Sequence, residues 1–281
     1  NWASAMAYSQ PTDLAAALSF LDRAHPRVIA GGTDVYPAMP QGAAPAALLD
    51  VTRIDGFAAI REDTHGLRLG AAVTWSDIVK AVLPPAFDAL KQAAREVGSL
   101  QIQNAGTVAG NICNASPAAD GVPALLTLDA EVEMASAARG TRRLALRDFI
   151  TGVRQTALAY DELVTALVIP TQPDGMTSAF GKLGSRRYLV ISIAMTAANI
   201  VLDATGRIAE ARIAVGACSA VATRLRALEA DLVGADPRQI AIAPRHLAPL
   251  APIDDVRGSG AYRLKAVEHQ IRQAIQRAID A

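Results

Sequence analysis

Near the N-terminus the sequence reads Val28-Ile29-Ala30-Gly31-Gly32-Thr33-Asp34-Val35, a short apolar run that stops at two glycines. The apolar run predicts a buried strand, and the glycines allow a tight turn whose N–H groups can approach a ligand closely. Successive N–H groups of this kind form an anion-binding concavity, and Thr33 and Asp34 add a hydroxyl and a carboxylate beside it. A strand followed by a glycine turn is also common as a purely structural feature, and the stretch matches neither the dinucleotide fingerprint nor the phosphate loop. Taken alone, it leaves a ligand-binding and a structural interpretation open.

A second stretch of small residues runs from Asn104 to Asp120 and reads Asn-Ala-Gly-Thr-Val-Ala-Gly-Asn-Ile-Cys-Asn-Ala-Ser-Pro-Ala-Ala-Asp. Its content of glycine and asparagine is too high for a regular element, which predicts a loop. Amide, hydroxyl and carboxylate groups lie among the small residues, where they can reach a ligand across closely approaching backbone. An ordinary surface loop would not need so many small apolar residues. The two stretches together favour a ligand-binding site more strongly than either does alone.

The composition is that of a globular protein whose positive and negative charges are balanced. Hydrophobic residues make up 51% of the 281 residues and aromatic residues only 4%, so the core consists mainly of Ala, Val, Leu and Ile. Lys plus Arg and Asp plus Glu each number 27, and this balance gives no footprint for nucleic acid or an anionic membrane surface. No apolar stretch reaches the roughly 20 residues of a transmembrane helix, and residues 1–10 do not resemble a signal peptide. We therefore expect a soluble, cytoplasmic protein that binds neither nucleic acid nor membrane.

Cysteine and histidine usage argues against metal chemistry within this chain. Cys113 and Cys218 are the only cysteines, and neither belongs to a C-x-x-C pair. The four histidines are scattered and form no metal-binding motif. A disulfide scaffold, a zinc site or an iron–sulfur cluster held by this chain is therefore not expected.

The spacing of apolar residues predicts an α+β protein in two parts. The first part covers residues 1–170, with subdomains over about 1–55 and 56–170, and the second covers residues 177–281. Residues 171–176 form the boundary, because they place a proline and a glycine among polar residues. In the second part, two strands joined by a turn at 203–206 precede two helices. The expected helices are 14–24, 74–82, 87–97, 124–128, 222–232 and 262–279, and the expected strands are 28–30, 47–51, 67–71, 131–134, 163–169, 197–202 and 208–215.

Both stretches resemble motifs of one known family. Ala30-Gly-Gly-Thr-Asp34 resembles the A-G-G-T-D/S-L segment of the FAD subunit of molybdenum hydroxylases, the xanthine dehydrogenase and carbon monoxide dehydrogenase family. Thr107-Val-Ala-Gly-Asn111 and Ala115-Ser-Pro-Ala-Ala-Asp120 resemble its T-I-G-G-N and A-S-P-x-x-D. Further similar segments follow in the expected order over nearly the whole chain, at 152–156, 162–170, 178–187, 255–259 and 262–263. The resemblance implies a two-part FAD-binding domain of the vanillyl-alcohol-oxidase (PCMH-like) type, followed by a small C-terminal domain of an antiparallel sheet with helices.

The resemblance also implies which residues hold FAD. Residues 28–35 would surround the pyrophosphate, while the second stretch would hold the diphosphate and the ribityl chain. Asp120 would accept a hydrogen bond from a ribose or adenine-side group, and the backbone at Val164 would contact the isoalloxazine. Lys182 would lie beside the flavin, where a cation stabilises negative charge; the alternative for Lys182 is a solvated surface lysine. The implied FAD-binding residues are Val28, Ile29, Ala30, Gly31, Gly32, Thr33, Asp34, Val35, Thr107, Ala109, Gly110, Asn111, Cys113, Asn114, Ser116, Asp120, Val164 and Lys182; no catalytic side chain and no metal ligand is implied.

Three positions depart from the family's motifs. Ala109 replaces the first glycine of T-I-G-G-N, so one additional methyl group must fit there, while Val35 replaces a leucine and Gly258 an alanine. None of these changes removes a polar ligand, so FAD binding remains the expectation. Cys113, within the second stretch, is interpreted as a small buried residue rather than a redox thiol.

The function that the resemblance implies is electron transfer within a complex. A flavin can take electrons singly and release them as a pair, so it connects iron–sulfur clusters to a two-electron acceptor. The resemblance assigns molybdopterin to a large partner subunit and two [2Fe–2S] clusters to a small one, with this chain as the middle-sized subunit of a heterotrimer. The acceptor would be a nicotinamide such as NAD, oxygen, a quinone or another carrier. Thr33-Asp34 and Ala115-Ser-Pro117 favour the xanthine-type branch, because the carbon monoxide branch usually reads A-G-G-H-S and G-D-P there.

Two other functions remain open at this point. One is a stand-alone FAD-dependent oxidoreductase of the same fold, which would need an acid or base residue facing the flavin. The other is an interaction protein of this fold that has lost the cofactor.

Overall fold

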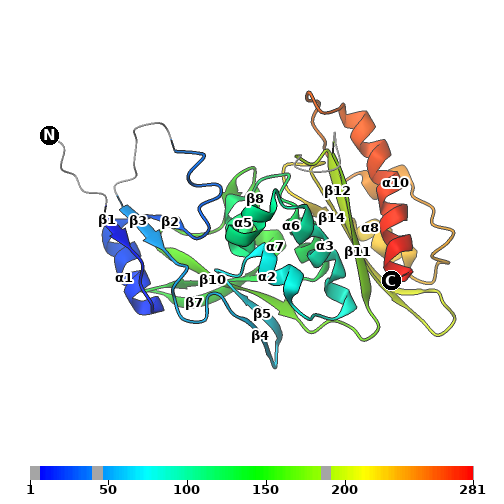
Figure 1. Ribbon diagram of the computed structural model, residues 1–281. Coiled ribbons are helices and arrows are strands. Elements are labelled where there is room, and N and C mark those ends of the chain that lie inside the picture. The colour runs from blue at the N-terminus through cyan, green and yellow to red at the C-terminus, as the bar shows by residue number, and fades with distance from the viewer. Residues whose placement is uncertain (1–6, 40–46, 185–190, 281) are drawn as a thin grey trace.

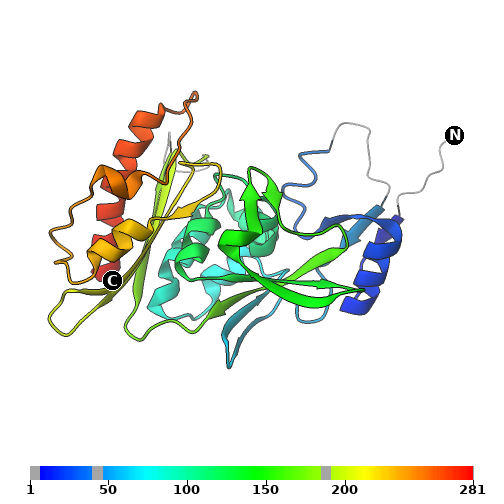
Figure 2. The same ribbon diagram turned by 180° about the vertical axis from the view of Figure 1, so that it is seen from behind.

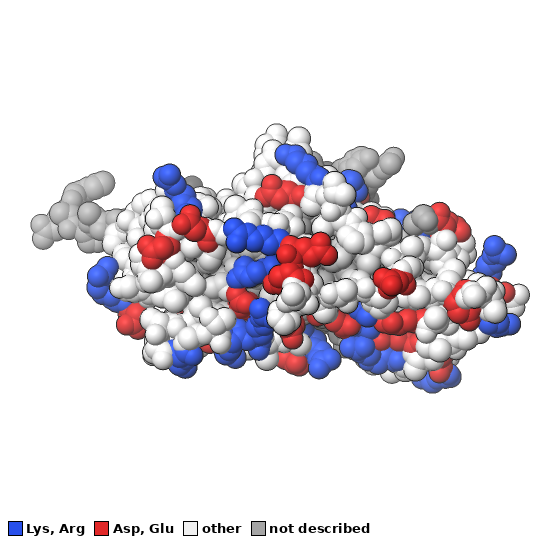
Figure 3. Space-filling view, turned by 90° about the horizontal axis from the view of Figure 1, so that it is seen from below, with Lys and Arg blue, Asp and Glu red and all other residues white. Residues whose placement is uncertain are grey.

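The computed structural model describes residues 7–39, 47–184 and 191–280. The predictions that concern residues 1–6 and 185–187 therefore lie outside the described residues. The molecule is elongated, with a small N-terminal sheet at one end and the C-terminal helix at the other (Figure 1). On the face seen in Figure 3, acidic and basic side chains are interspersed, as the balanced charge predicts. Among the described residues, no helix combines the length and the apolar character needed to cross a lipid bilayer.

A three-stranded parallel sheet forms the N-terminal end. In this sheet β3 (Ala47–Asp50) lies between β1 (Ala7–Ser9) and β2 (Arg27–Ile29). Helix α1 (Leu14–Ala24) connects β1 to β2 and has the predicted bounds, because the Asp13 side chain accepts a hydrogen bond from the Ala16 N–H and caps it. The glycine pair follows β2 directly, so the first stretch leaves this sheet at the carboxyl end of a strand.

A five-stranded antiparallel sheet forms the middle of the molecule, in the order β4-β5-β10-β6-β7. Its central strand β10 is buried along all of its length except Pro170, which explains the continuous apolar run in its sequence. A β-bulge at Thr165 interrupts the pairing of β10 with β6 between Val164 and Ala166. The five strands are β4 (Ile60–Asp63), β5 (Gly66–Gly70), β6 (Glu131–Ser136), β7 (Gly140–Ala145) and β10 (Glu162–Pro170).

Short helices fill the space between this sheet and the C-terminal sheet (Figures 1 and 2). They are α2 (Trp75–Lys80), the 3-10 helix η1 (Pro85–Phe87), α3 (Asp88–Glu96), α4 (Leu100–Ala105), α5 (Val108–Asn114) and α6 (Gly121–Thr127). Helix α7 (Leu146–Phe149) and the hairpin of β8 (Ile150–Gly152) and β9 (Gln155–Thr156) follow β7.

The prediction that the second stretch is a loop is wrong, because this stretch contains the end of α4 and all of α5. Ser99 caps α4, and the Thr107 hydroxyl accepts a hydrogen bond from the Gly110 N–H and caps α5. Val108 and Ile112 of α5 are buried in the core. Caps and packing thus outweigh the low helix propensity of glycine and asparagine.

The C-terminal part is a four-stranded antiparallel sheet with helices. Its order is β11-β12-β13-β14, and α10 packs on the outer face while α3 and α6 pack on the inner face (Figure 1). The predicted hairpin and helices are present, although α8 begins later than expected because Thr223 and Arg224 pair with β13 instead. The elements are β11 (Thr177–Leu183), β12 (Ala194–Leu202), β13 (Ile208–Gly216), β14 (Thr223–Arg224), α8 (Arg226–Leu232), α9 (Pro244–Leu247) and α10 (Gly260–Ile279). This arrangement confirms the α+β class with an antiparallel C-terminal sheet.

The inner face of the C-terminal sheet shares one core with the N-terminal part. Phe180 and Met195 belong to the same buried cluster as Leu90 and Val132. Ser178 on β11 accepts a hydrogen bond from the Ala89 N–H and donates one to the Pro85 carbonyl, both at 2.9 Å. Residues 171–176 connect β10 to β11, and the two-domain division at this point remains a prediction.

Candidate functional site

A cavity of about 1210 Å³ lies where the N-terminal loop, helices α4 to α6 and strand β10 meet. Ordinary small-molecule sites have volumes of roughly 300–1,000 Å³. The cavity therefore has room for an extended ligand.

The structure brings almost all of the predicted site residues to this one cavity. Every residue predicted to bind FAD lines it except Ile29, whose side chain is buried in the core. Successive side chains of a strand point to opposite faces, so Val28 takes the cavity side and Ile29 the core side. The two stretches, distant in sequence, thus form one site.

Gly31 is the point where the two stretches touch. A Cβ atom at this position would lie 1.8 Å from the carbonyl oxygen of Ala105 and 2.9 Å from the Gly106 nitrogen. The Gly106 carbonyl in turn accepts a hydrogen bond from the Trp75 N–H at 3.1 Å, which fixes the second stretch against α2. Only a residue without a side chain allows this close approach.

Gly32 turns the backbone so that several N–H groups remain open. Its φ of +70° lies in the left-handed region, which favours glycine. Within the described residues, the N–H groups of residues 31–35 donate to no protein acceptor. Because backbone donors require partners, this turn is suited to an anionic ligand.

Asn111 presents a second unsatisfied group across the cavity. Its Oδ1 atom is buried and accepts no hydrogen bond from any described residue. The nearby Asn114 accepts a hydrogen bond from Arg154, which lies at the tip of the β8–β9 hairpin with a φ of +54°. Arg154 also lines the cavity, although the sequence analysis gave it no role; the only signal was its place in the similar segment at 152–156.

Lys182 is held inside the cavity wall by a buried ion pair. Its Nζ lies 2.8 Å from Asp120 Oδ2, and its side chain is only 9% exposed. The alternative that Lys182 is a solvated surface lysine is therefore wrong. Ser192 donates to the other carboxylate oxygen at 2.8 Å. Burial raises the pKa of Asp120 above its usual value, against the opposing effect of the Lys182 charge.

The C-terminal helix supports this ion pair from behind. Arg263, which is 2% exposed, donates from Nη1 to the Ile193 carbonyl at 2.6 Å and from Nη2 to Asp255 at 2.7 Å. Ile193 follows Ser192 directly, so Arg263 fixes the segment that binds Asp120. The backbone N–H of Arg257, with the Arg257 and Arg263 side chains, lowers the pKa of Asp255 to about 2 despite partial desolvation.

Cys113 differs from its predicted environment. The interpretation as a buried residue is wrong, because the side chain is exposed to the cavity, whereas Ile112 beside it faces the core. The protein that surrounds the thiol nevertheless raises its pKa to about 12. It is therefore a neutral thiol near pH 7. Ala109, the departure from the glycine motif, is buried at the cavity edge, so its methyl group is accommodated.

The sequence analysis also missed the apolar part of the wall. Val97, Ile102, Leu158 and Ile191 line the cavity, and they come from four separate segments. No sequence pattern connects them, because only the fold brings them together. The cavity thus offers open N–H donors and an apolar surface, which suits a ligand with both anionic groups and a flat ring.

Comparison with known proteins gives matches over almost the whole chain. Residues 4–172 match the family model described as "FAD binding domain in molybdopterin dehydrogenase", and residues 179–278 match "CO dehydrogenase flavoprotein C-terminal domain". The chain is 35% identical to the nicotinate dehydrogenase FAD-subunit of Eubacterium barkeri over 75% of this chain and 72% of that protein. It is 30% identical to the xanthine dehydrogenase FAD-binding subunit of Escherichia coli O157:H7, over 98% and 96%. A solved structure of the Cu,Mo-CO dehydrogenase superposes with a TM-score of 0.87 at 27% identity, covering 98% of each chain.

Proposed function

Because this chain belongs to the family of FAD-binding medium subunits of molybdenum hydroxylases, we propose that it holds FAD in the large cavity and passes electrons from partner subunits to an external acceptor. Membership makes it an oxidoreductase subunit, with the two-part FAD-binding fold that the sequence motifs imply. Which residues bind the cofactor, and which subunits are the partners of the chain, are proposals.

The open N–H groups at the glycine turn carry this proposal. Residues 31–35 line a cavity that is large enough for a dinucleotide, and their N–H groups donate to no acceptor among the described residues, which matches a pyrophosphate. Asn111 Oδ1 is free to accept a hydrogen bond from a hydroxyl of the same ligand. The residues predicted from sequence, except Ile29, would hold FAD, with Arg154, Ser192 and the apolar residues of the wall added.

Lys182 supplies positive charge to the flavin end of the site. Asp120 and the Glu96 carbonyl hold its amine at 2.8 and 3.2 Å, so the charge stays in place. A fixed cation in a site of low dielectric stabilises nearby negative charge strongly. When bound, FAD supplies one-electron and two-electron redox chemistry, and no side chain of this chain needs to act as acid, base or nucleophile.

We further propose a heterotrimer with a large molybdopterin-binding subunit and a small [2Fe–2S] subunit. The support is that two cysteines cannot ligate such clusters, and that relatives are named as FAD-subunits of dehydrogenases. Xanthine-type chemistry is the proposed branch, on the Thr33-Asp34 and Ala115–Pro117 segments alone. The proposed acceptor is an external carrier such as NAD, which these segments do not select. A cytoplasmic location rests on the sequence grounds given above.

Purification of the chain from its source cell tests the proposal. We expect two other subunits to copurify, with a flavin absorbance spectrum and with molybdenum and iron in the metal analysis. Catalytic activity of the isolated chain with a small-molecule substrate would favour a stand-alone oxidoreductase instead. A colourless chain that gains no flavin absorbance on titration with FAD would exclude FAD binding altogether.

A further inference from the structure

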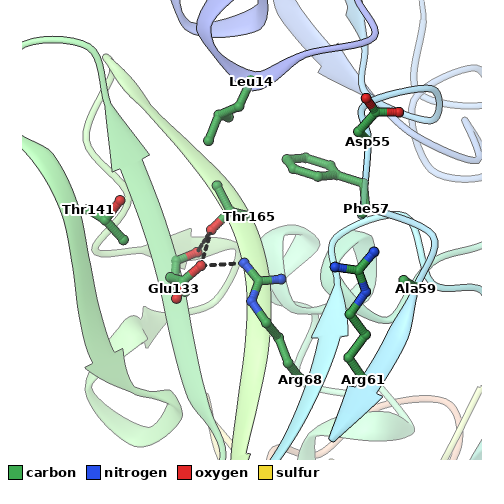
Figure 4. Close-up of a pocket in the computed structure, with 10 residues that line it drawn as sticks. Leu14, Asp55, Phe57, Ala59, Arg61, Arg68, Glu133, Thr141 and Thr165 are labelled. Carbon is green, nitrogen blue, oxygen red and sulfur yellow. Dashed lines mark hydrogen bonds and ion pairs between the residues drawn. The ribbon is translucent and has the colours of Figure 1, made fainter. Parts of the chain in front are cut away.

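A second, smaller cavity lies beside β10 and has no role in the proposed function. Its volume is about 250 Å³, and its walls come from the loop after β3, from strands β4, β5, β6, β7 and β10, and from the start of α1 (Figure 4). Val164 lines the large cavity, whereas the next residue, Thr165, lines the small one. The central strand therefore separates two sites.

Two arginines meet in this cavity without a shared counter-charge. Arg61 on β4 is paired directly opposite Arg68 on β5, and like charges in this position destabilise a sheet. Both guanidinium groups extend toward the space beneath the Phe57 ring (Figure 4). Within the described residues, Arg61 makes no hydrogen bond and no ion pair, whereas Arg68 pairs with Glu133 at 2.5 Å.

Glu133 cannot also neutralise Arg61, because its carboxylate is already saturated. Oε1 accepts hydrogen bonds from Arg68 and from Thr165 at 2.8 Å, and Oε2 accepts two from Arg143 at 3.0 and 3.1 Å. Four hydrogen bonds use the full capacity of a carboxylate. Asp55, at the rim, lies beyond Phe57 from both guanidinium groups (Figure 4). The lining holds two arginines and two carboxylates, but Glu133 also binds Arg143 from outside the cavity, so Arg61 has no carboxylate partner among the described residues.

We propose that this cavity binds a small monocarboxylate with an apolar body of about one ring, its carboxylate between Arg61 and Arg68. A guanidinium fork matches the two oxygens of a carboxylate, and the ligand would supply the carboxylate partner that Arg61 lacks among the described residues. Phe57 and Leu14 provide the apolar contact for the ring (Figure 4). The volume lies below that of drug-sized sites, which restricts the ligand to a compact molecule.

Calorimetric titration of benzoate into the FAD-loaded full chain, at constant ionic strength, tests this proposal. We expect saturable binding that is at least tenfold weaker in Arg61→Gln, because the unshared guanidinium group is lost. Arg147→Gln is the matched control, since Arg147 is exposed and does not line the cavity; it should bind benzoate as the unchanged chain does. Acetate and inorganic phosphate should each bind at least tenfold more weakly than benzoate, because neither brings a ring to Phe57.

Four results would overturn the proposal: no saturable binding of benzoate, equal binding by Arg61→Gln, equal loss in Arg147→Gln, or phosphate or acetate binding as tightly as benzoate. Binding to the isolated chain that disappears in the assembled complex would overturn the assignment to a free ligand, because a partner subunit would then cover the cavity.

Two further measurements separate this proposal from the FAD site and from misfolding. Arg61 does not line the large cavity, so Arg61→Gln should keep its full flavin content. Without benzoate its thermal midpoint should be unchanged or higher, because the repulsion from Arg68 is removed. A lower midpoint would show that Arg61 is already balanced within the protein, and this would contradict the proposal.

Discussion

The two glycines of the first stretch serve different purposes. Gly31 has an ordinary backbone conformation but no space for a side chain, because Ala105 lies against it. Gly32 has a left-handed conformation, and a Cβ atom there would lie 2.3 Å from the ring of Tyr36. The sequence predicted a tight glycine turn, but it did not show that one glycine serves packing and the other serves the turn.

Replacing Gly32 with alanine should weaken FAD binding. The left-handed conformation costs a residue with a side chain about 1–2 kcal/mol. The turn would relax toward an ordinary conformation, and this would move the N–H groups away from the positions that bind the ligand. We expect at least a tenfold loss of FAD affinity, measured by quenching of flavin fluorescence on the FAD-free chain. Gly206→Ala is the control, because Gly206 has a similar φ of +79° with open space around it and lies outside the cavity. Equal FAD affinity in the two variants would disprove the role of the first turn.

The Asp120–Lys182 ion pair should be coupled in a double-mutant cycle. Lys182→Met leaves a buried carboxylate without its partner, so we expect a loss of about 3–5 kcal/mol in the free energy of unfolding at pH 7. Asp120→Asn combined with Lys182→Met should cost less than the two single changes together. Arg272→Met is the control, since its pair with Glu268 is exposed and should contribute below about 1 kcal/mol. Urea unfolding of the FAD-free chain measures the free energy of unfolding of all four variants. If the losses of the two single changes add up to the loss of the double change, the pair is not coupled.

At the level of elements, Asp255, Arg257 and Arg263 connect the segment before α10 to the cavity wall, and we call these three residues the clasp. Asp255 binds both Arg257 and Arg263, and Arg263 reaches from α10 to the Ile193 carbonyl. The sequence analysis found these residues in the similar segments at 255–259 and 262–263 but assigned them no function. The Ile193 and Ala217 carbonyls that Arg263 binds lie 70 and 46 residues away along the chain, so these contacts could not be derived from spacing.

This clasp should give the stability of the chain an acid-dependent component. The pKa of Asp255 is lowered from its ordinary value to about 2, so the clasp stabilises the folded state above about pH 4 and loses this effect as the pH falls toward 2. Asp255→Asn should therefore lower the thermal midpoint at pH 7, and its difference from the unchanged chain should shrink between pH 4 and 2. Asp174→Asn, at an exposed aspartate without a hydrogen bond among the described residues, should have no effect at either pH. A constant difference across this range would exclude the role of the Asp255 charge.

For the whole molecule, the shared core predicts one cooperative unfolding transition. The tryptophans are Trp2 and Trp75, both in the N-terminal part, while Phe180 belongs to the C-terminal sheet. Phe180→Ala should cost about 3–5 kcal/mol and should lower the urea midpoint seen by tryptophan fluorescence as much as the midpoint seen by circular dichroism. Val256→Ala, at a fully exposed position, should change neither midpoint. If Phe180→Ala left the midpoint seen by tryptophan fluorescence unchanged, the two parts would unfold independently.

The sequence alone predicted several of the regular elements and the residues that share one cavity. Helical and alternating spacings are local, so α1, β10, the β12–β13 hairpin and α10 were predictable from neighbouring residues. The motif residues of both stretches were also sufficient to predict that they meet at one ligand, and all but Ile29 line the same cavity.

Only the tertiary structure decided what surrounds these residues. It made the second stretch helical through caps and packing, turned Cys113 toward the cavity, buried Lys182 against Asp120 and brought Arg154 and Arg263 to the site. It also placed two arginines opposite each other beside a saturated carboxylate. The physical reason is the same in each case: burial, ion pairing and charge balance depend on contacts between segments distant in sequence, and a local pattern carries no information about them.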